Sequence, residues 1–568
     1  MEWKEHYQRW MNFEQLESTL KQQLQNLNDT EQEEAFHKPI SFGTGGMRGE
    51  LGPGINRMNV YTIRKAAKGL ALHIEEKGEE WKRKGVVVAH DPRHMSKSFA
   101  LEIAKVMGVH GIKTYLFTDI RPTPLLSFAV RHLKTANGVM ITASHNPPEY
   151  NGFKVYNEDG GQLPLEPSEE LMELVKSVDN ELNIPVLSEQ ELNAQNLLKW
   201  LEDEVDQAYL KKLESMAYDH DMPKDDLNIV FTPLHGTATS LVERGLKQQG
   251  FTNLTLVKEQ VIADPNFTTV ASPNPEEHQA FTKAIEYGEE VLADLLIATD
   301  PDADRLGVAV KDNENEYQVL TGNQLGALLL DYILRHEQFN QGVMVKTIVT
   351  SEMGRAIAKS YGVETQDVLT GFKFISEKIK QFESTHEKQF VFGYEESYGC
   401  LIKPFARDKD AVQATVMTAE MAAYWNKQGY TLYEALQQLY RKHGYYLEDL
   451  HSVKLAGLAG QEKINQMLQD FKQINELNVD GLKLQYKEDY STLKRTNVET
   501  NEEETIQLPK TNAIKFIFDQ NSWCCLRPSG TEPKIKFYFA VKGETEQEAQ
   551  DKLQSLKETI LNLVKVEV

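Results

Sequence analysis

The sequence predicts an α/β protein of several domains, and three observations indicate this class. Its 568 residues correspond to about three to four domains of ordinary size. Short apolar runs typical of buried strands alternate with helical stretches, a pattern that favours layered domains with a largely parallel sheet core. This strand–helix order recurs in three successive blocks and changes near the end, so we expect three copies of one fold unit followed by a different domain.

The first block, residues 1–200, is expected to be an N-terminal α/β domain. Large apolar side chains recur at roughly helical spacing from Trp3 to Leu24, so residues 1–37 should form helices that pack against the domain. The patterns predict strands at 85–91, 114–118 and 138–141, and helices around 59–77 and 97–110. The boundary near 200 falls in a charged, leucine-spaced region, 166–217, which is typical of helices and a connection.

The second and third blocks, residues 201–320 and 321–448, repeat this order of elements. The second block should contain strands at 227–231, 254–257 and 295–300. The third should contain helices at 322–336 and 351–360 and strands at 342–349 and 389–393. The last region, 449–568, shows alternating strand patterns at 513–518 and 535–541 and a closing helical pattern at 545–564, so a smaller α+β domain is expected there.

The charge balance limits the partners that the protein can bind. Basic residues number 62 and acidic residues 85, which gives a net charge of −23. We therefore expect no binding to nucleic acid or to membranes, and an anionic substrate would need positive side chains concentrated in one cleft. The three cysteines, Cys400, Cys524 and Cys525, are too few for a disulfide framework, and the last two lie in an apolar strand pattern typical of a core. With neither a signal peptide nor a membrane span in the sequence, we expect a cytoplasmic protein.

One serine stands at a position suited to chemistry. Ser144 follows the apolar run 138–141 and precedes two prolines, Pro147 and Pro148. Prolines disfavour a helix start and keep the backbone extended, so we expect a stiff, exposed loop that presents one hydroxyl at the carboxyl end of a strand. Ligands bind at this edge of open α/β sheets. An ordinary turn rich in asparagine and proline would show the same local pattern.

Three carboxylates end the second block: Asp300, Asp302 and Asp304, with Arg305 after them. Alternate side chains share one face of an extended backbone, so the three should converge at a strand end. An EF-hand begins similarly, but it requires glycine and glutamate where this chain has Arg305 and Lys311. A capping cluster is the alternative. Because three close carboxylates repel one another without a cation, we favour a site for a hard divalent cation such as Mg²⁺.

Three further loops carry groups suited to phosphate or sugar. The glycine-rich segment 41–49 contains Arg48 but lacks the ending of a Walker loop, and it is either an anion-binding nest or a simple turn. Residues 393–399 include Glu395 and Ser397, which suit sugar hydroxyls, whereas we interpret the charged run 407–410 as surface. The segment 527–534 has a composition suited to holding phosphate, with Arg527, Ser529, Gly530, Thr531 and Lys534.

Together these loops resemble the α-D-phosphohexomutase superfamily in both content and order. The resemblance covers about residues 40–541 and rests on the serine loop, Asp-Pro-Asp-Ala-Asp-Arg at 300–305, Gly-Tyr-Glu-Glu-Ser at 393–397 and Arg-Pro-Ser-Gly-Thr-Glu-Pro-Lys at 527–534. Details at 42–48, 300–304 and 393–397 are most similar to the phosphoglucomutase/phosphopentomutase branch. The resemblance implies three similar α/β domains with mixed sheets and a smaller C-terminal α+β domain around a central cleft.

The resemblance also implies a role for each candidate residue. Ser144 would carry a phosphoryl group as phosphoserine and, with Asp300, Asp302 and Asp304, would bind one Mg²⁺ per subunit. Arg48 and Lys154 would lie beside it as catalytic residues; Lys154 is the favoured acid/base, and a metal-lowered barrier with little need for a base is the alternative. The substrate-binding set would be Arg305, Lys373, Glu395, Ser397, Arg527, Ser529, Gly530, Thr531 and Lys534. We interpret His145 and His235 as hydrogen-bonding supports.

The expected function is that of an isomerase that interconverts α-D-glucose 1-phosphate and glucose 6-phosphate. Glucose 1,6-bisphosphate would be both its intermediate and its activator. One alternative is a phosphopentomutase acting on ribose or deoxyribose 1-phosphate, and another is a sugar-bisphosphate synthase with a separate phosphoryl donor. A non-enzymatic sensor of sugar phosphates would be expected to lack Ser144 or one of the aspartates, and all four are present. The partner would be a small sugar phosphate, and the protein a monomer or homodimer.

Overall fold

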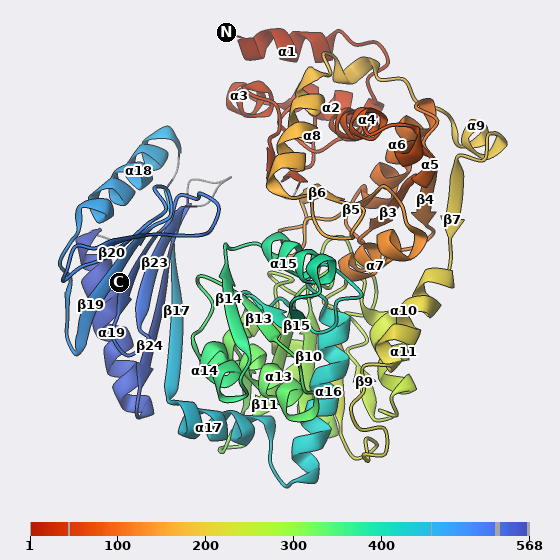
Figure 1. Cartoon of the computed structure of the whole chain (residues 1–568). Helices are drawn as coiled ribbons and strands as arrows, with labels where there is room; N and C mark the ends of the chain where they lie inside the picture. The colour runs from red at the N-terminus through yellow and green to blue at the C-terminus, as the bar shows by residue number, and fades with distance from the viewer. Residues whose placement is uncertain (1, 44–45, 456, 529–533, 565–568) are drawn as a thin grey trace. The chain divides into compact units, whose positions relative to one another are not determined.

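The computed structural model describes residues 2–43, 46–455, 457–528 and 534–564. The chain forms two compact units. Figure 1 labels the helices and strands along the whole chain. The first unit is Met1–Leu325 with Phe372–Thr431, and the second is Gly326–Gly371 with Leu432–Val568. Ser144 and the three aspartates all belong to the first unit, whereas Arg527 and Lys534 belong to the second.

Three helices open the first unit, which confirms the helical packing element expected at 1–37. They are α1 (Glu2–Met11), α2 (Ser18–Asn26) and α3 (Asp29–Phe36). Helix α3 begins with a capping box between Asn28 and Glu31, which satisfies amide groups at its start. The apolar faces of these helices meet α4 (Val60–Glu76) in an aromatic cluster that includes Trp10, Phe36 and Tyr61. The N-terminal layer is therefore anchored by burial to the first sheet's helices.

The first sheet holds the serine loop between two of its central strands. Its strand order is β1-β2-β6-β5-β3-β4-β7. The strands are β1 (Phe42–Gly43), β2 (Gly46–Glu50), β3 (Val86–His90), β4 (Thr114–Phe117), β5 (Asn137–Ile141), β6 (Tyr150–Tyr156) and β7 (Leu198–Leu201). Strand β3 is parallel to both β4 and β5, whereas β6 is antiparallel to β5 and β2, so the sheet is mixed. Accompanying helices are α5 (Glu79–Lys84), α6 (Ser96–Val109), α7 (Thr123–Leu133), α8 (Leu165–Ser177), α9 (Glu189–Ala194) and α10 (Glu204–Glu214).

The second sheet carries the three aspartates where its parallel part meets its antiparallel part. Its order is β12-β11-β10-β8-β9. The strands are β8 (Ile229–Thr232), β9 (Leu254–Leu256), β10 (Leu295–Thr299), β11 (Leu306–Lys311) and β12 (Tyr317–Leu320). Strand β8 is parallel to β9 and β10, and β11 is antiparallel to β10, so residues 300–305 connect two neighbouring antiparallel strands. Helices α11 (Thr239–Gln248) and α12 (Thr282–Val291) belong to this part of the chain.

The rest of the first unit begins at Phe372. Helix α15 (Phe372–Thr385) precedes β15 (Gln389–Tyr394), which pairs antiparallel with β16 (Cys400–Leu401). Helix α16 (Ala411–Lys427) packs against β10, β11 and α11. The loop between β16 and α16 therefore lies next to the strands that carry the aspartates.

In the second unit, β13 (Gly342–Thr347) and β14 (Glu364–Val368) are parallel neighbours, and α14 (Met353–Ser360) packs on β14. Helix α13 (Gly322–His336) begins in the first unit and continues into the second, and α17 (Leu432–His443) follows later in the chain. A largely antiparallel sheet has the order β17-β24-β23-β22-β19-β20-β21, and β18 pairs with β19. Its strands are β17 (Tyr445–Lys454), β18 (Asn478–Val479), β19 (Leu482–Asp489), β20 (Lys494–Asn497), β21 (Glu503–Thr505), β22 (Ile514–Phe518), β23 (Trp523–Pro528) and β24 (Lys534–Gly543).

Two helices complete this last layer, α18 (Gly457–Gln473) and α19 (Glu546–Leu563), and they share one apolar core with the strands. Cys524 and Cys525 are buried in β23, as the apolar pattern predicted. The α/β class and the smaller α+β end of the chain are confirmed. None of the helices within the described ranges combines the length and apolar character that a membrane span demands.

Candidate active site

The serine loop, residues 142–150, connects β5 to β6 and holds Ser144 in a tight backbone turn. Ser144 has φ 53°, in the left-handed region, and its amide donates to Thr142 Oγ1 at 2.9 Å. The expectation of an exposed serine is wrong, because only 4% of Ser144 is accessible. Its hydroxyl instead donates to Asp300 Oδ2 at 2.7 Å and lies 3.1 Å from His145 Nδ1. The loop thus directs the hydroxyl toward the carboxylates instead of toward solvent.

The aspartate loop, residues 300–305, brings its three carboxylates together by turning. The prediction of convergence holds, but the extended backbone from which we derived it is wrong. The amide of Ala303 donates to the Asp300 carbonyl at 2.9 Å, and Ala303 has φ 54°. Carboxylate oxygens of Asp300, Asp302 and Asp304, the aspartate trio, lie within 4.8 Å of one another, and all three residues are buried.

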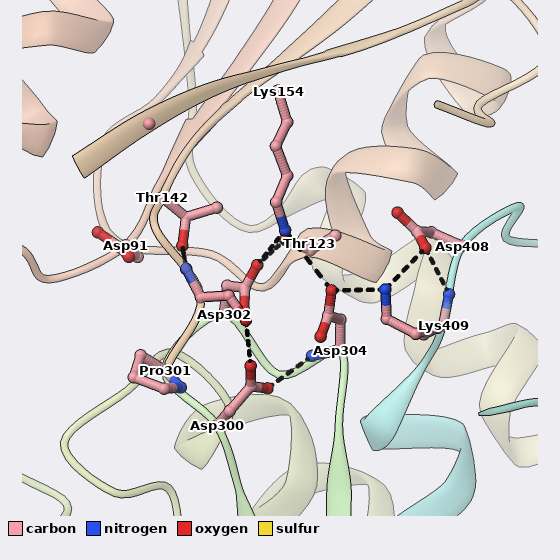
Figure 2. Close-up of polar contacts among 12 residues, drawn as sticks. Asp91, Thr123, Thr142, Lys154, Asp300, Pro301, Asp302, Asp304, Asp408 and Lys409 are labelled. Atoms are coloured by element: carbon pink, nitrogen blue, oxygen red, sulfur yellow. Dashed lines mark hydrogen bonds and ion pairs between the residues drawn. The ribbon is translucent and has the colours of Figure 1, made fainter. Parts of the chain in front are cut away.

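The hydrogen bonds of the trio leave particular oxygens available for a cation (Figure 2). Asp302 Oδ2 accepts from Lys154 Nζ and from Thr123 Oγ1, each at 2.8 Å. Asp304 Oδ2 lies 2.9 Å from Lys409 Nζ. Among the described residues, the buried atoms Asp302 Oδ1 and Asp304 Oδ1 have no hydrogen-bond partner. Two such oxygens beside the Ser144 hydroxyl fit a hard divalent cation, which prefers oxygen ligands.

The pKa shifts of the three aspartates also fit a site for a cation. Burial raises the pKa of Asp300 well above its ordinary value, and Asp302 and Asp304 raise it further. Burial also opposes ionisation of Asp302, yet the charge of Lys154 and the hydrogen bonds that the carboxylate accepts hold its pKa below the ordinary value. Lys154 and Lys409 therefore favour the ionised forms of Asp302 and Asp304, whereas the neutral form of Asp300 is favoured until a bound cation offsets its burial.

Three side-chain cations surround the trio: Lys154, Arg305 and Lys409. Burial opposes the charge of Lys154, but Asp302 and Asp304 raise its pKa, so its ammonium form dominates. Arg305 contacts Glu276, and its amide donates to Asp300 Oδ1 at 3.0 Å. Both Lys154, on β6, and Arg305 were predicted site residues, and the structure places each against an aspartate.

Lys409 was missed, because we interpreted the charged run 407–410 as surface. That interpretation is wrong, since each of the four residues is buried. Asp408 lies 3.6 Å from Lys409 Nζ and accepts from Tyr156 Oη at 2.8 Å. Asp410 caps α16 by accepting from the amides of Val412 and Gln413. An aspartate directly before a long apolar helix is a sequence signal for such a cap, and it could have indicated that the run is part of the fold.

The remaining predicted residues of the first unit are placed less closely around the trio. Arg48 donates to Asn146 Oδ1 at 3.0 Å, so it lies beside the serine loop. Glu395 is buried and interacts electrostatically with Arg305 and Lys409. Ser397 is half-buried on the same loop. Lys373 lies over the ring of Phe374 at 5.2 Å, and burial lowers its pKa.

His235 is a hydrogen-bonding support, as we expected, whereas His145 also contacts the reacting serine. His235 is hydrogen-bonded through both ring nitrogens, to the Ile262 carbonyl at 2.9 Å and to Thr269 Oγ1 at 2.8 Å. His145 contacts the Ser144 hydroxyl itself, as described above. Burial lowers the pKa of His145 well below its ordinary value, and Arg305 lowers it further, so the imidazole is neutral. Nδ1 of a neutral imidazole can accept the serine proton in the tautomer protonated at Nε2, once the hydroxyl turns away from Asp300.

The predicted phosphate-holding segment lies in the second unit. Arg527 is on β23 and Lys534 begins β24, two neighbouring antiparallel strands. Both side chains therefore stand near the end of the strand pair at which the connection 529–533 joins them. Ser529, Gly530 and Thr531, the other predicted members, lie outside the described residues.

Comparison with known proteins identifies the family of the chain along most of its length. Four family models, all described as phosphoglucomutase/phosphomannomutase domains, match in order: α/β/α domain I at 39–182, domain II at 207–314, domain III at 321–443 and the C-terminal domain at 465–555. A curated phosphoglucomutase of Staphylococcus aureus (strain MRSA252) is 41% identical over 529 residues, which cover 93% of this chain and 94% of that protein.

Solved structures share the fold at low sequence identity. Parafusin of Paramecium, an exocytosis-sensitive phosphoprotein also titled a phosphoglucomutase, superposes with a TM-score of 0.70 at 18% identity, covering 93% of this chain and 96% of that one. An N-acetylphosphoglucosamine mutase of Aspergillus fumigatus, in complex with GlcNAc-6P and magnesium, gives a TM-score of 0.50 at 13% identity, with coverage of 93% and 96%. With all four domain models matched in order and a relative above 40% identity along nearly its whole length, the chain belongs to the phosphoglucomutase/phosphomannomutase family.

Proposed function

We propose that the protein is a phosphoglucomutase, which interconverts α-D-glucose 1-phosphate and glucose 6-phosphate through a phosphoserine at Ser144. One observation carries the proposal. The Ser144 hydroxyl lies 2.7 Å from Asp300, inside a buried group of three carboxylates and three side-chain cations. A serine in such a place is suited to carrying phosphate, because the cations neutralise the phosphoryl charge that the carboxylates alone would repel. The name of the Staphylococcus aureus relative supports the choice of glucose phosphates.

The proposed reaction has two transfers that share one serine. In the first, the phosphoserine Oγ–P bond breaks and an O6–P bond forms on glucose 1-phosphate, and the proton of the 6-hydroxyl ends on Ser144 Oγ. The product is glucose 1,6-bisphosphate. In the second, the phosphoryl group at C1 of this intermediate passes to Oγ, and the proton returns to O1 of the sugar. Because one phosphoryl group leaves Ser144 for O6 and the other returns to it from C1, the enzyme releases glucose 6-phosphate and regains its phosphoserine in each turnover.

Residues of this chain have separate tasks in these transfers. Lys154 and Lys409 place positive charge on the trio, and Arg48 reaches the serine loop through Asn146. Two groups are candidates for moving the proton. Lys154, as the resemblance suggested, is an ammonium here and can act only as the acid, whereas the neutral imidazole of His145, which lies 3.1 Å from Ser144 Oγ, can accept. Burial and Arg305 hold the pKa of His145 well below its ordinary value, so its imidazole starts uncharged but is a weak base.

The residues fit one Mg²⁺, held by Asp300, Asp302, Asp304 and the phosphoryl group on Ser144. Two of these carboxylates present buried oxygens without a hydrogen-bond partner among the described residues, as noted above. When bound, the ion would withdraw negative charge from the phosphoryl group. The magnesium in the Aspergillus structure supports this choice of metal for the family.

The predicted substrate-binding residues divide into those that would contact the sugar and those that would hold its phosphate groups. We propose that Glu395 and Ser397 accept hydrogen bonds from sugar hydroxyls, and that Arg305 and Lys373 contact the sugar phosphate. Arg527, Ser529, Gly530, Thr531 and Lys534 would hold the phosphate that does not react. Arg527 and Lys534 at the joined ends of β23 and β24 support this assignment, since two cations on adjacent strands suit a dianion.

The test is a coupled assay in which glucose 6-phosphate is oxidised as it forms from glucose 1-phosphate. The wild-type protein should turn over with Mg²⁺ and a trace of glucose 1,6-bisphosphate, whereas Ser144→Ala should lose at least about 10³-fold in kcat. Ser144→Ala activity within about tenfold of wild type would contradict the phosphoserine. A panel with ribose, mannose and glucosamine 1-phosphates distinguishes the substrates, and a higher kcat/KM for ribose 1-phosphate would make the protein a phosphopentomutase instead.

A further inference from the structure

A buried arginine outside the proposed chemistry holds the serine loop from behind. Arg93 follows β3, and its side chain is fully buried. Its two terminal nitrogens donate to four backbone carbonyl oxygens of the serine loop. The acceptors are Ser144 at 2.7 Å, Asn146 at 2.5 Å, Pro147 at 2.7 Å and Tyr150 at 3.1 Å. One planar guanidinium is thus hydrogen-bonded to carbonyls along most of the loop, including the carbonyl of the proposed phosphoserine.

Arg93 is itself held by two residues, Asp91 and Phe267. Asp91 Oδ1 accepts from the Arg93 amide at 2.9 Å and from Ser96 Oγ at 2.8 Å, and Asp91 Oδ2 lies 3.2 Å from Arg93 Nε. The ring of Phe267, from the segment that follows β9, lies 4.9 Å from the guanidinium. Burial opposes the charge of Arg93, and Asp91 supports it. The guanidinium is therefore a rigid part of the fold and not a mobile surface cation.

The far end of the loop is tied to the same group of residues. Asn151 Nδ2 donates to Ser96 Oγ at 2.9 Å and to the His94 carbonyl at 2.9 Å. Both Ser96 and His94 are near neighbours of Arg93 in sequence. The segment 91–96 consequently fixes the serine loop at its start, along its length and where it enters β6.

This arrangement matters because the loop backbone is not held by regular structure. The carbonyls of Ser144, Asn146 and Pro147 lie between β5 and β6, beyond the strand ladder. Ser144 also has a left-handed backbone conformation, φ 53°, which is unfavourable for a residue with a side chain and requires outside contacts to persist. Without the guanidinium, the carbonyls of Ser144, Asn146 and Tyr150 would lose this donor, and Pro147 would keep only the Tyr150 amide at 3.1 Å. The backbone that carries Ser144 Oγ would then be held less firmly.

We propose that Arg93 is a positioning residue that holds Ser144 Oγ in line for phosphoryl transfer, through the main chain and without touching the phosphate. This rests on the proposed function of Ser144. Misplacing a reacting atom by about 1 Å costs about 100-fold in rate. Loss of the hydrogen bonds from the Arg93 guanidinium to the serine loop should therefore lower kcat for both directions of the reaction. The KM for glucose 1-phosphate and the Mn²⁺ affinity of the unphosphorylated protein should change little in Arg93→Lys, because the variant keeps the positive charge that Asp300 and Asp302 sense.

The test compares Arg93→Lys with Arg64→Lys in the full-length protein. Arg64 is a matched control, since its guanidinium pairs with the mostly buried Glu102 at 2.7 Å in the same part of the fold but serves no loop carbonyl. A lysine at 93 keeps the charge and can donate to some of the carbonyls, so the variant should fold, and Arg93→Gln provides a second variant. The readouts are kcat, KM, Mn²⁺ affinity by calorimetry, the rate of Ser144 phosphorylation by glucose 1,6-bisphosphate, and thermal unfolding.

For Arg93→Lys we expect kcat and the phosphorylation rate to fall by about 100-fold, with KM and Mn²⁺ affinity within about threefold of wild type. Arg64→Lys should keep kcat within about threefold. The inference is overturned if Arg93→Lys and Arg93→Gln keep wild-type kcat, if Arg64→Lys loses as much, or if the loss comes only with unfolding or metal release. A wild-type protein without mutase turnover would refute the proposed function itself, whereas an active wild type with an unaffected Arg93→Lys variant refutes only this role of Arg93.

Discussion

Thr123 offers a sharp test of the metal site, because it touches a proposed ligand without being one. It begins α7 and is completely buried. Its amide donates to the Asp302 carbonyl at 2.8 Å, and its hydroxyl donates to Asp302 Oδ2 at 2.8 Å. The hydroxyl therefore helps to hold Oδ2 of the carboxylate and leaves Oδ1, which has no hydrogen-bond partner among the described residues, available to a cation.

The substitution Thr123→Val removes this hydroxyl and keeps the volume and the backbone contact. A hydrogen bond to a charged group contributes about 1.5–3 kcal/mol. Lys154 still holds the same oxygen at 2.8 Å, so we expect the lower end of this range. A loss of about 1.5 kcal/mol corresponds to roughly tenfold weaker Mg²⁺ binding, in line with the effect of groups that orient metal ligands.

The assay is mutase activity at saturating glucose 1-phosphate over a range of free Mg²⁺, with Mn²⁺ binding measured by calorimetry. Thr123→Val should shift the half-saturating Mg²⁺ concentration upward by about tenfold and recover most of its activity at high Mg²⁺. Thr123→Ser keeps the hydroxyl and should stay within about threefold of wild type. An unchanged metal dependence in Thr123→Val, or an equal shift in Thr123→Ser, would refute the reasoning.

Three further predictions concern charge in the first unit. Exhaustive chelation should abolish mutase activity and added Mg²⁺ should restore it; full activity after chelation would contradict a metal at the aspartate trio. Lys409→Met removes the cation 2.9 Å from Asp304 Oδ2 but leaves Lys154 Nζ at 3.5 Å, so the variant should unfold at lower urea with a loss near the lower end for a broken buried pair, about 3 kcal/mol in the apoprotein. A midpoint equal to wild type would show that the Lys409–Asp304 pair does not stabilise the fold. Burial raises the pKa of Asp410 from 3.8 to about 6. Between these two values the carboxyl is neutral in the folded protein and ionised in the unfolded chain. The stability of wild type relative to Asp410→Asn should then fall by up to about 3 kcal/mol as pH rises from about 4 to about 7, and urea midpoints that keep a constant difference across this window would contradict it.

Much of the fold could be predicted because strand and helix patterns are local. The apolar runs at 85–91, 138–141 and 295–300 became β3, β5 and β10, and the helix expected at 322–336 is α13 with the same bounds. These segments are long or strongly apolar, so tertiary contacts reinforce the local preference. The domain boundaries that we place at 200, 320 and 448 remain predictions.

The site was predicted less completely, for a physical reason. Ser144 and the aspartate trio stand out as residue types at strand ends, which a sequence displays directly. The burial of Ser144 depends on Asp300, a residue from another sheet, and the role of Lys409 depends on Asp304. Such pairings arise only from tertiary packing, so the charges of the run 407–410 do not reveal them, and only Asp410, as a cap before an apolar helix, carried a sequence signal. Arg93 was missed for the same reason, since its acceptors are backbone carbonyls of a distant loop.

The most direct test of the account is to follow the phosphoryl group itself. The protein is incubated with glucose 1,6-bisphosphate labelled with ³²P at both phosphates, quenched within a single turnover, digested and analysed by mass spectrometry. We expect label on Ser144. Addition of unlabelled glucose 1-phosphate should remove this label from the protein at a rate no slower than kcat. Formation of glucose 6-phosphate with label on another residue, or with none on the protein, would contradict the account.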